Sequence, residues 1–469
     1  MDAAAILDQI KTRSAVTFHS TAQLSAEVRR KAARLEKERA EKAEVPPEPV
    51  PNLSPVPEAQ AVRNMDVTPW ELVQVLGRAT ALAMHGPSLT IAQHWSCLRY
   101  VTALQAGHRG RMERSGDGRK SQYHRKGVQA QDLGIAFGLA AALRLLERRH
   151  RGYRFEVVDA DLALEAGWRL RAEGKHKAKQ ECVKHRPGYF LVGRRPGAPL
   201  RVASVACRGS HGPSEYQVGQ LARSAPHIRA VASGDYADGS DLLPGIALAT
   251  GQASEGGIET RLLTSAGGGG LLSIPGKAAP DLDGVPEGKN LEPGIACAEP
   301  KTGERITRAG FSIAEHDREW FSQVLVRASA AALLTFAGDR ESAHGLLSTR
   351  AQQNRLGEEN SEVGAGMLCD VAVQLGGVSF MGTDHVFRIK RQRVEVFSGI
   401  SANSYRLLRQ HQLEEHEREL ARLRHDWPRI QRKAEAEWGG VLHLDGSGAL
   451  LAIREQGRGE GAKLTEQAP

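Results

Sequence analysis

Cysteine and histidine residues in the middle of the chain have spacings that raise the question of a metal site. Cys182 and His185 form a C-x₂-H pair, and Cys207 and His211 form a C-x₃-H pair, each near the end of a strand-like segment. Zn²⁺ binds sulfur and imidazole nitrogen, but these spacings differ from those of zinc ribbons. We therefore expect cysteines buried in a sheet rather than a zinc site.

Positive charge is concentrated in the segment HRGRMERSGDGRKSQYHRK. Its basic residues are Arg109, Arg111, Arg114, Arg119, Lys120, Arg125 and Lys126. The glycines between them predict a flexible loop. Such a run is either a solvated connector or a cluster that holds the phosphates of a nucleic acid, and the sequence leaves both interpretations open.

A third group of chemically capable residues lies in three short motifs. RPGYFLV begins at Arg186, VACRGSHG begins at Val205, and QVGQLA begins at Gln217. Arg208, in the second motif, can contact a phosphate with both arms of its guanidinium group. It is a poor proton-transfer group, because the pKa of arginine is above about 12.

The elements that position these motifs are predicted from hydrophobic periodicity and turn residues. The expected order is helix, three strands, helix, strand. The segments are a helix at 130–150, strands at 153–164, 187–195 and 200–209, a helix at 214–231 and a strand at 245–254. A Pro-Gly turn at Pro196 and Gly197 joins the second and third strands.

This order and these motifs resemble the PD-(D/E)xK restriction-endonuclease-like family over residues 122–264. In that family the second strand begins with Pro-Asp, the third strand carries Glu-x-Lys, and the next helix often carries Gln. Related bacterial members would read approximately PDYFL, ECKGTHG and QL. The resemblance implies an α/β fold with a mixed sheet flanked by helices, and a catalytic region that includes Arg208, Gln217 and Gln220.

The chain departs from the family where the chemistry takes place. Gly188 occupies the place of the aspartate, Ala206 that of the glutamate, and Arg208 that of the lysine. These nucleases hold Mg²⁺ through oxygen ligands, and glycine and alanine supply none. We therefore expect a pseudo-nuclease that has no cofactor, and in which Arg208 binds nucleic acid without cutting it.

Relocated acids are the alternative, because carboxylates move between neighbouring elements in this family. In that case Mg²⁺ would bind and some cleavage would survive. The candidates are Asp132, Asp159, Asp161, Glu181 and Glu215. For Asp132, Asp159 and Asp161, capping or a place at a strand end is the simpler explanation.

The composition bounds the class of protein. The chain has 469 residues, 63 Lys and Arg against 55 Asp and Glu, and five widely scattered cysteines. No stretch reaches eighteen uncharged apolar residues, so we expect a cytoplasmic protein that does not span a membrane. The net charge of +8 is compatible with a polyanionic partner. The abundance of Ala, Gly and Arg is typical of a GC-rich bacterial genome.

Composition shifts divide the chain into six expected segments. These are a charged helix and Pro-rich linker at 1–65, a helical hairpin and basic loop at 66–121, the restriction-endonuclease-like domain at 122–264, a Gly/Pro-rich connector at 265–304, an α+β module at 305–440 and a C-terminal tail at 441–469.

The resulting hypothesis is a nuclease-related protein that binds DNA in bacterial defence, such as defence against phage, or in the maintenance of mobile DNA. This biological context rests on family analogy. The alternative from another class is a non-enzymatic scaffold that keeps the nuclease fold for contacts with other proteins. The α+β module at 305–440 is a possible surface for a protein partner.

Overall fold

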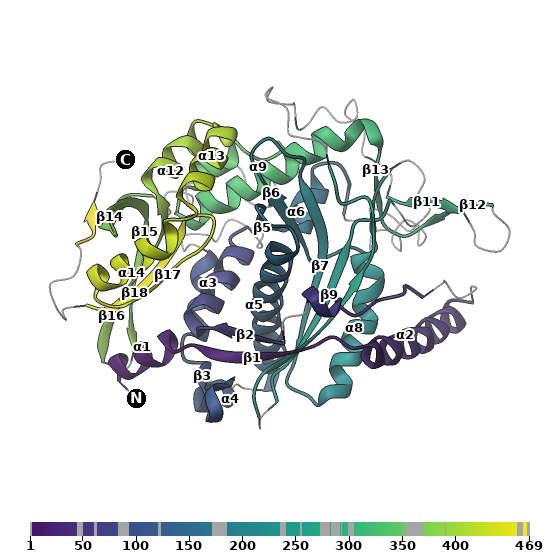
Figure 1. Cartoon of the computed structure of the whole chain (residues 1–469), viewed down its shortest axis with the longest axis horizontal. Helices are drawn as coiled ribbons and strands as arrows, with labels where there is room; N and C mark the ends of the chain where they lie inside the picture. Colours follow the sequence, from purple (N-terminus) through teal and green to yellow (C-terminus); the bar gives the residue numbers. More distant parts are fainter. Residues whose placement is uncertain are drawn as a thin grey trace. The chain divides into compact units, whose positions relative to one another are not determined.

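The computed structural model of the chain is shown in Figure 1. It describes residues 2–44, 50–60, 63–82, 93–120, 123–170, 185–234, 241–253, 256–272, 282, 291, 293–298, 304–349, 351–352, 369–389, 391–456 and 463–466. Two compact units interleave along the sequence. The first unit comprises Met1–Ser14, Asp66–Lys120 and Val326–Pro469, and the second comprises Ala15–Met65 and Ser121–Leu325.

The second unit is organised around a curled, mixed sheet of seven strands. In spatial order the strands are β2 (Asn64–Val67), β1 (Ser14–His19), β10 (Glu259–Ser265), β9 (Gly245–Gly251), β7 (Arg201–Ser210), β6 (Tyr189–Arg194) and β5 (Arg154–Asp159). Strands β5, β6 and β7 are antiparallel, and β9 is parallel to β7. Strand β10 is antiparallel to β9 and parallel to β1.

Helices cover both faces of this sheet. Helix α5 (Tyr123–Arg149) packs against β7 and β9, while α8 (Ser214–Ile228) packs against the same strands and against α2 (Ala22–Ala43). Figure 1 shows α5 and α8 on opposite sides of β7 and β9. Helix α5 approaches closely because Gly134 and Gly138 lie against the backbone of Gly209 and the side chain of Cys207.

The predicted order of elements over residues 122–264 is confirmed in its main features. The PGYFLV and VASVACR segments lie in one sheet as neighbouring strands, with Tyr189 paired to Val205. Two details differ. Residues Ala160–Glu165 form helix α6 instead of continuing β5, because Asp159 caps it by accepting a hydrogen bond from the backbone N–H of Leu162. Strand β10 was not predicted.

The N-terminal 65 residues are not only a solvated helix and a linker. Leu24, Val28 and Ala32 of α2 are buried in a cluster with α8. In the Pro-rich segment, Leu53 is buried and Ser54 pairs with Thr264 of β10. The apolar stripe of α2 is short, but it has a partner surface on α8, so it packs into the core.

The first unit contains a six-stranded antiparallel sheet. Its order is β17 (Val441–Leu444), β18 (Ala449–Glu455), β16 (Gln392–Ser401), β15 (Val378–Ile389), β14 (Val371–Leu375) and β19 (Thr465–Glu466). Its helices are α1 (Ala3–Lys11), α3 (Pro69–Thr80), α4 (Gly116–Arg119), α10 (Arg340–His344), α12 (Ala402–Arg409), α13 (Leu413–Leu423) and α14 (Trp427–Trp438). Helix α9 (Arg318–Phe336) is divided between the two units at Val326.

The expected segments 66–121 and 441–469 are not separate from the α+β module. The expected tail at 441–469 supplies β17, β18 and β19, and β18 pairs with β16 along seven residues. Residues 66–121, expected to form a separate segment, join the same unit: the indole N–H of Trp70 donates to the Leu451 carbonyl at 2.9 Å. Burial of apolar strands and tryptophan makes these distant segments one core.

The expected helical hairpin at 66–106 is half correct. Helix α3 begins as predicted, with the Thr68 hydroxyl accepting from the N–H of Glu71 and Pro69 in the first turn. The second half is a 3-10 helix, η2 (Gln93–Tyr100), followed by strand β3 (Leu104–Ala106), which pairs with β4 (Met112–Arg114).

Short elements complete the described structure. They are η1 (Glu58–Gln60), η3 (His108–Gly110), η4 (Glu315–Asp317), β8 (Val231–Ser233), β11 (Ile295–Ala298), β12 (Arg305–Arg308) and β13 (Phe311–Ile313). Most of the expected connector at 265–304 lies outside the described residues. Of the helices that are described, none has the length and apolar character needed to cross a membrane.

Candidate functional site

The site lies where β7 extends past the beginning of β6. Tyr189, the first residue of β6, pairs with Val205, so residues 206–210 of β7 continue without β6 beside them. Glutamine amides occupy that side. Gln131 donates to the carbonyl of Cys207 at 3.1 Å, and Gln220 donates to the carbonyl of Gly209 at 2.7 Å.

This geometry gives both predicted glutamines structural positions. Gln220 satisfies a backbone acceptor that has lost its ladder partner, which matters because an unpaired buried carbonyl is costly. Gln217 is buried, and its amide fills the space over Gly251 at the end of β9, where a Cβ atom would overlap it. The sequence did not single out Gln131 for this part, although it comes directly before Asp132.

Side chains alternate between the two faces of β7. Cys207 and Gly209 face α5, as their contacts with Gly138 and Gly134 show. Ala206 faces α8 and lies in a buried apolar cluster with Leu221 and others. Arg208 is two residues further along the strand, so its side chain leaves the same face as Ala206.

Gly188 and Ala206, the two positions compared with acids in the sequence, differ in their surroundings. Gly188 is exposed, and the nearest atom to a Cβ built there is the Val205 carbonyl oxygen at 3.7 Å. Ala206 is only 4% exposed, among apolar side chains. A carboxylate therefore has room at Gly188, whereas at Ala206 it would be desolvated.

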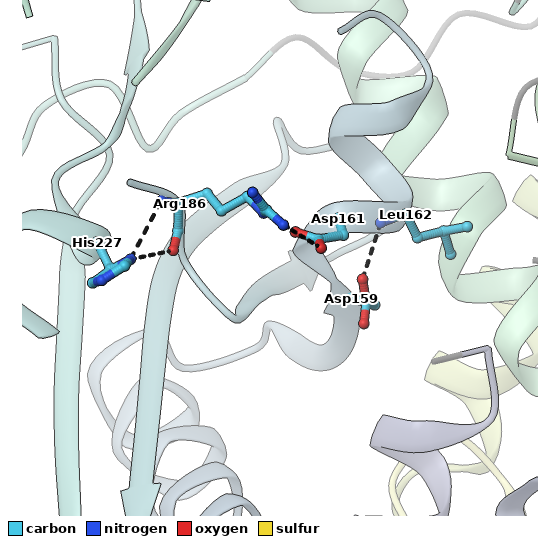
Figure 2. Close-up of polar contacts among 5 residues, drawn as sticks. All are labelled: Asp159, Asp161, Leu162, Arg186 and His227. Atoms are coloured by element: carbon cyan, nitrogen blue, oxygen red, sulfur yellow. Dashed lines mark hydrogen bonds and ion pairs between the residues drawn. The ribbon is translucent and has the colours of Figure 1, made fainter. Parts of the chain in front are cut away.

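Basic side chain types gather beside these two positions. We call this group the basic corner, and it consists of Arg186, Arg208 and the imidazoles of His185 and His227, with the carboxylate of Asp161 beside Arg186. The guanidinium of Arg186 binds both carboxylate oxygens of Asp161, with 2.9 Å between Nη2 and Oδ2 and a second bond from Nε to Oδ1. Figure 2 shows Asp161 turned toward Arg186, and His227 against the backbone of Arg186 on the other side.

His227 is neutral at physiological pH. Burial, followed by the nearby His185, Arg208 and Arg186, lowers the pKa of His227 to about 4, against a hydrogen bond to the Arg186 backbone that raises it. Nδ1 lies 3.0 Å from the carbonyl oxygen and 3.4 Å from the N–H of Arg186. The shorter contact places the proton on Nδ1, because a carbonyl oxygen only accepts.

The basic corner has an excess of positive charge. Two guanidinium groups, of Arg186 and Arg208, stand against the single carboxylate of Asp161. Within the described part of the chain, no carboxylate forms an ion pair with Arg208. The charge of this corner suits an anion and disfavours a divalent cation.

The described candidates for relocated acids do not assemble around Arg208. Asp159 caps α6 (Figure 2) and Asp161 is paired with Arg186. Asp132 and Asp159 both lie near Tyr189, whose pKa is raised first by burial and then by these carboxylates and Cys207. Tyr189 is paired with Val205 and so faces α5, the side opposite Arg208.

Of the last two candidates, one is described. Glu215 is exposed in the first turn of α8, and Glu181 lies outside the described residues. Across the described segments, no group of three or more His, Cys, Asp or Glu is arranged to hold a metal ion. Gly188 and Ala206 supply no side-chain oxygen and thus do not fit Mg²⁺, which requires oxygen ligands.

Comparison with known proteins gives no relative. No protein family, curated protein or solved structure matches this chain.

The described members of the expected cysteine and histidine pairs, Cys207, His185 and His211, form no metal-binding group. Cys182 lies outside the described residues. Cys207 packs against Gly138, and burial raises the pKa of its thiol, which disfavours the thiolate that a metal needs. The His211 ring bonds to Gln252 at 3.2 Å, while His185 stacks edge-on against His227. The expectation of a buried sheet cysteine is confirmed for Cys207.

The described part of the basic run contains regular structure in place of the expected flexible loop. It includes strand β4, which pairs with β3, and helix α4, capped by the Ser115 hydroxyl. Arg114 is 5% exposed because it sits at an inward position of β4, and burial lowers its pKa. It is therefore a structural residue. The exposed members are Arg109, Arg111, Arg119 and Lys120 in the first unit, and Arg125 and Lys126 in the second.

Proposed function

We propose that this protein binds nucleic acid through a restriction-endonuclease-like core that does not cleave by the family's metal mechanism. The observation that carries the proposal is the basic corner: Arg208 and Arg186 lie beside positions where a nuclease would hold its metal. The antiparallel β5–β6–β7 strands, the α8 crossover and the parallel strand β9 support the family-like core.

The chemistry of the basic corner favours a phosphate. A guanidinium group offers parallel N–H donors that match two phosphate oxygens, and it stays charged at any physiological pH. Asp161 holds Arg186 in a fixed orientation, which reduces the entropy lost on binding. Arg208 supplies a second charge on the neighbouring strand.

Cleavage is disfavoured by the same residues. A divalent ion would need carboxylates near Gly188 and Ala206, and it would face the fixed charge of Arg208. Without such an ion, the largest source of transition-state stabilisation in this chemistry is missing. The proposed context of bacterial defence or mobile-DNA maintenance rests on family analogy alone.

A matched pair of arginine variants tests the proposal. Arg208→Gln removes the charge from the basic corner, and Arg223→Gln removes one exposed charge from α8 as the control. Fluorescence anisotropy with a short labelled duplex and a labelled single strand measures affinity. Loss of a charged hydrogen bond, about 1.5–3 kcal/mol, predicts a loss of about tenfold or more for Arg208→Gln and little change for Arg223→Gln.

The same samples are incubated with Mg²⁺ and Mn²⁺ to measure cleavage. We expect none above background. Cleavage by wild type that is abolished by alanine at Asp132, Asp159, Asp161, Glu181 or Glu215 would show that the acids have moved. Folded protein that binds neither nucleic acid at low salt would instead favour the scaffold alternative.

A further inference from the structure

A second feature of the second unit is a cavity of about 420 Å³ between β1, β2, β10 and the C-terminal half of α5. It lies in a different part of the sheet from the basic corner, because β1 and β10 are separated from β6 by β9 and β7. Its volume is in the range of small-molecule sites.

Apolar side chains form the interior of the cavity. Phe18 of β1, Leu145 of α5 and Leu262 of β10 are each less than a tenth exposed and line it together with Val56 and Met65. Ala141, one turn before Leu145 on α5, leaves the space open because its side chain is a single methyl group. These residues suit the hydrocarbon body of a ligand.

Hydrogen bonds donated by backbone N–H groups join the walls, so the cavity has a defined shape. The N–H of Phe18 donates to the Arg63 carbonyl at 2.8 Å, and the N–H of Val56 donates to the Ser20 hydroxyl at 2.8 Å. Strand β1 is also parallel to β10, with Phe18 paired to Thr260. These bonds connect the N-terminal segments to the sheet.

Among the charged lining residues, guanidinium groups outnumber carboxylates. Arg63 and Arg144 line the cavity, against one carboxylate, Glu58. His19 also lines it and lies 3.3 Å from Glu259 of β10. A partly apolar site with two guanidinium groups is complementary to a ligand that carries one negative charge on an apolar body.

We propose that this cavity binds a small organic anion with an apolar body, of the class of medium-chain carboxylates. The hydrocarbon part lies against Phe18, Leu145 and Leu262, and the carboxylate is bound by Arg63 and Arg144. This site is separate from the proposed nucleic-acid site and does not depend on it.

Binding of decanoate and of its neutral analogue decan-1-ol by the full chain tests the proposal. Isothermal titration calorimetry is expected to show one decanoate per chain and affinity for decanol at least about tenfold weaker, because the alcohol loses the charge-assisted bonds. Equal affinity for the two, or no binding of decanoate, would overturn the proposal.

Variants locate the binding site. The double change Arg63→Gln and Arg144→Gln is expected to weaken decanoate at least about tenfold, whereas Arg148→Gln, an exposed position of the same helix, is expected to leave it unchanged. Ala141→Trp fills the cavity and should abolish binding of both probes. Circular dichroism checks each fold. If Ala141→Trp does not fold, the double arginine variant still tests the proposal. Unchanged affinity of the double arginine variant for decanoate would contradict binding at this cavity.

Discussion

At the scale of single residues, the packing around Ala206 decides what that position can carry. Its methyl group lies with Leu221, Ala222 and Ala225 of α8 in a buried cluster. An ionised carboxylate there would lose its hydration without gaining a partner, which is costly in an apolar environment. The sequence showed an alanine at this position but not its apolar surroundings, which depend on α2 and α8 meeting over the strand.

This packing predicts that Ala206→Glu destabilises the protein instead of restoring a metal site. We expect a loss of about 3 kcal/mol or more in the free energy of unfolding, since the change buries an unpaired charge and overpacks the cluster. Urea denaturation measures it. Gly188→Asp is the matched control, because that position is exposed and open. Equal stability of the two variants would contradict this description of the cluster.

A second residue-scale prediction concerns His94 in the first unit. Its Nε2 lies 2.7 Å from the Ser398 hydroxyl, which itself donates to the Phe336 carbonyl, so Nε2 carries the proton and donates. Burial, followed by the charges of Arg78 and His385, lowers the pKa of His94 to about 3. The unfolded chain takes up a proton below its ordinary pKa of 6.5, while the folded protein does not.

Stability should therefore fall as pH decreases from 6.5 toward 3, with a contribution from His94 of a few kcal/mol, on the order of 1.4 per pKa unit. His94→Gln should be less stable at neutral pH and have a shallower pH dependence. Urea midpoints measured over this pH range check both effects. An identical pH slope in wild type and variant would show that His94 is not the titrating group.

At the scale of elements, the crossing of α5 over β7 positions the end of β7 that carries Arg208. Gly134 lets the helix approach: a Cβ atom there would lie 2.5 Å from the backbone nitrogen of Gly209. Gly209 has the same constraint, because a Cβ on it would overlap the Ala130 carbonyl. These two glycines fix the distance between helix and strand.

Gly134→Ala should accordingly destabilise the second unit by a few kcal/mol, since backbone must move to relieve the overlap. Gly127→Ala is the matched control in the same helix. Its Cβ meets nothing within 4 Å, so we expect a gain of about 0.5–1 kcal/mol from reduced flexibility of the unfolded chain. Thermal unfolding measures both, and a stabilising Gly134→Ala would contradict the close crossing.

The basic run yields a prediction about binding. Changing the exposed Arg109, Arg111 and Arg119 to Gln together should weaken DNA binding similarly for all sequences, because phosphate contacts carry no base information. Arg114→Gln should lower stability instead, since its side chain is buried. Anisotropy against several duplexes and urea denaturation separate the two effects. Unchanged affinity of the triple variant would identify the run as a connector.

The sequence predicted the elements of the central region well because their signals are local. The alternation in Tyr189–Arg194 and Arg201–Ser210 and the helix around Gln217 are each contained in one short window. The roles of Gln131 and Gln220 were not predictable, since they follow from the offset between β6 and β7. Arg186 was visible as the first residue of a motif, but its pairing with Asp161 needed the fold.

At the scale of the whole molecule, the division into two units could not be obtained from composition. Each unit is built from segments far apart in the chain, such as Ala15–Met65 with Ser121–Leu325. Linker-like composition marks the boundaries of contiguous domains, whereas pairing of β1 with β10 is a non-local contact. Non-local contacts also bury the apolar strands Val441–Leu444 and Ala449–Glu455, which the sequence had placed in a C-terminal tail.

The salt dependence of nucleic-acid binding by the whole protein is the sharpest test of phosphate binding at the basic corner. Neutralised phosphates release counterions, so the logarithm of the association constant should fall linearly with the logarithm of salt concentration. We predict a steep negative slope for wild type that becomes shallower in Arg208→Gln and is unchanged in sign and size in Arg223→Gln. Folded wild-type protein whose binding is absent at low salt, or whose affinity does not depend on salt, would contradict the account.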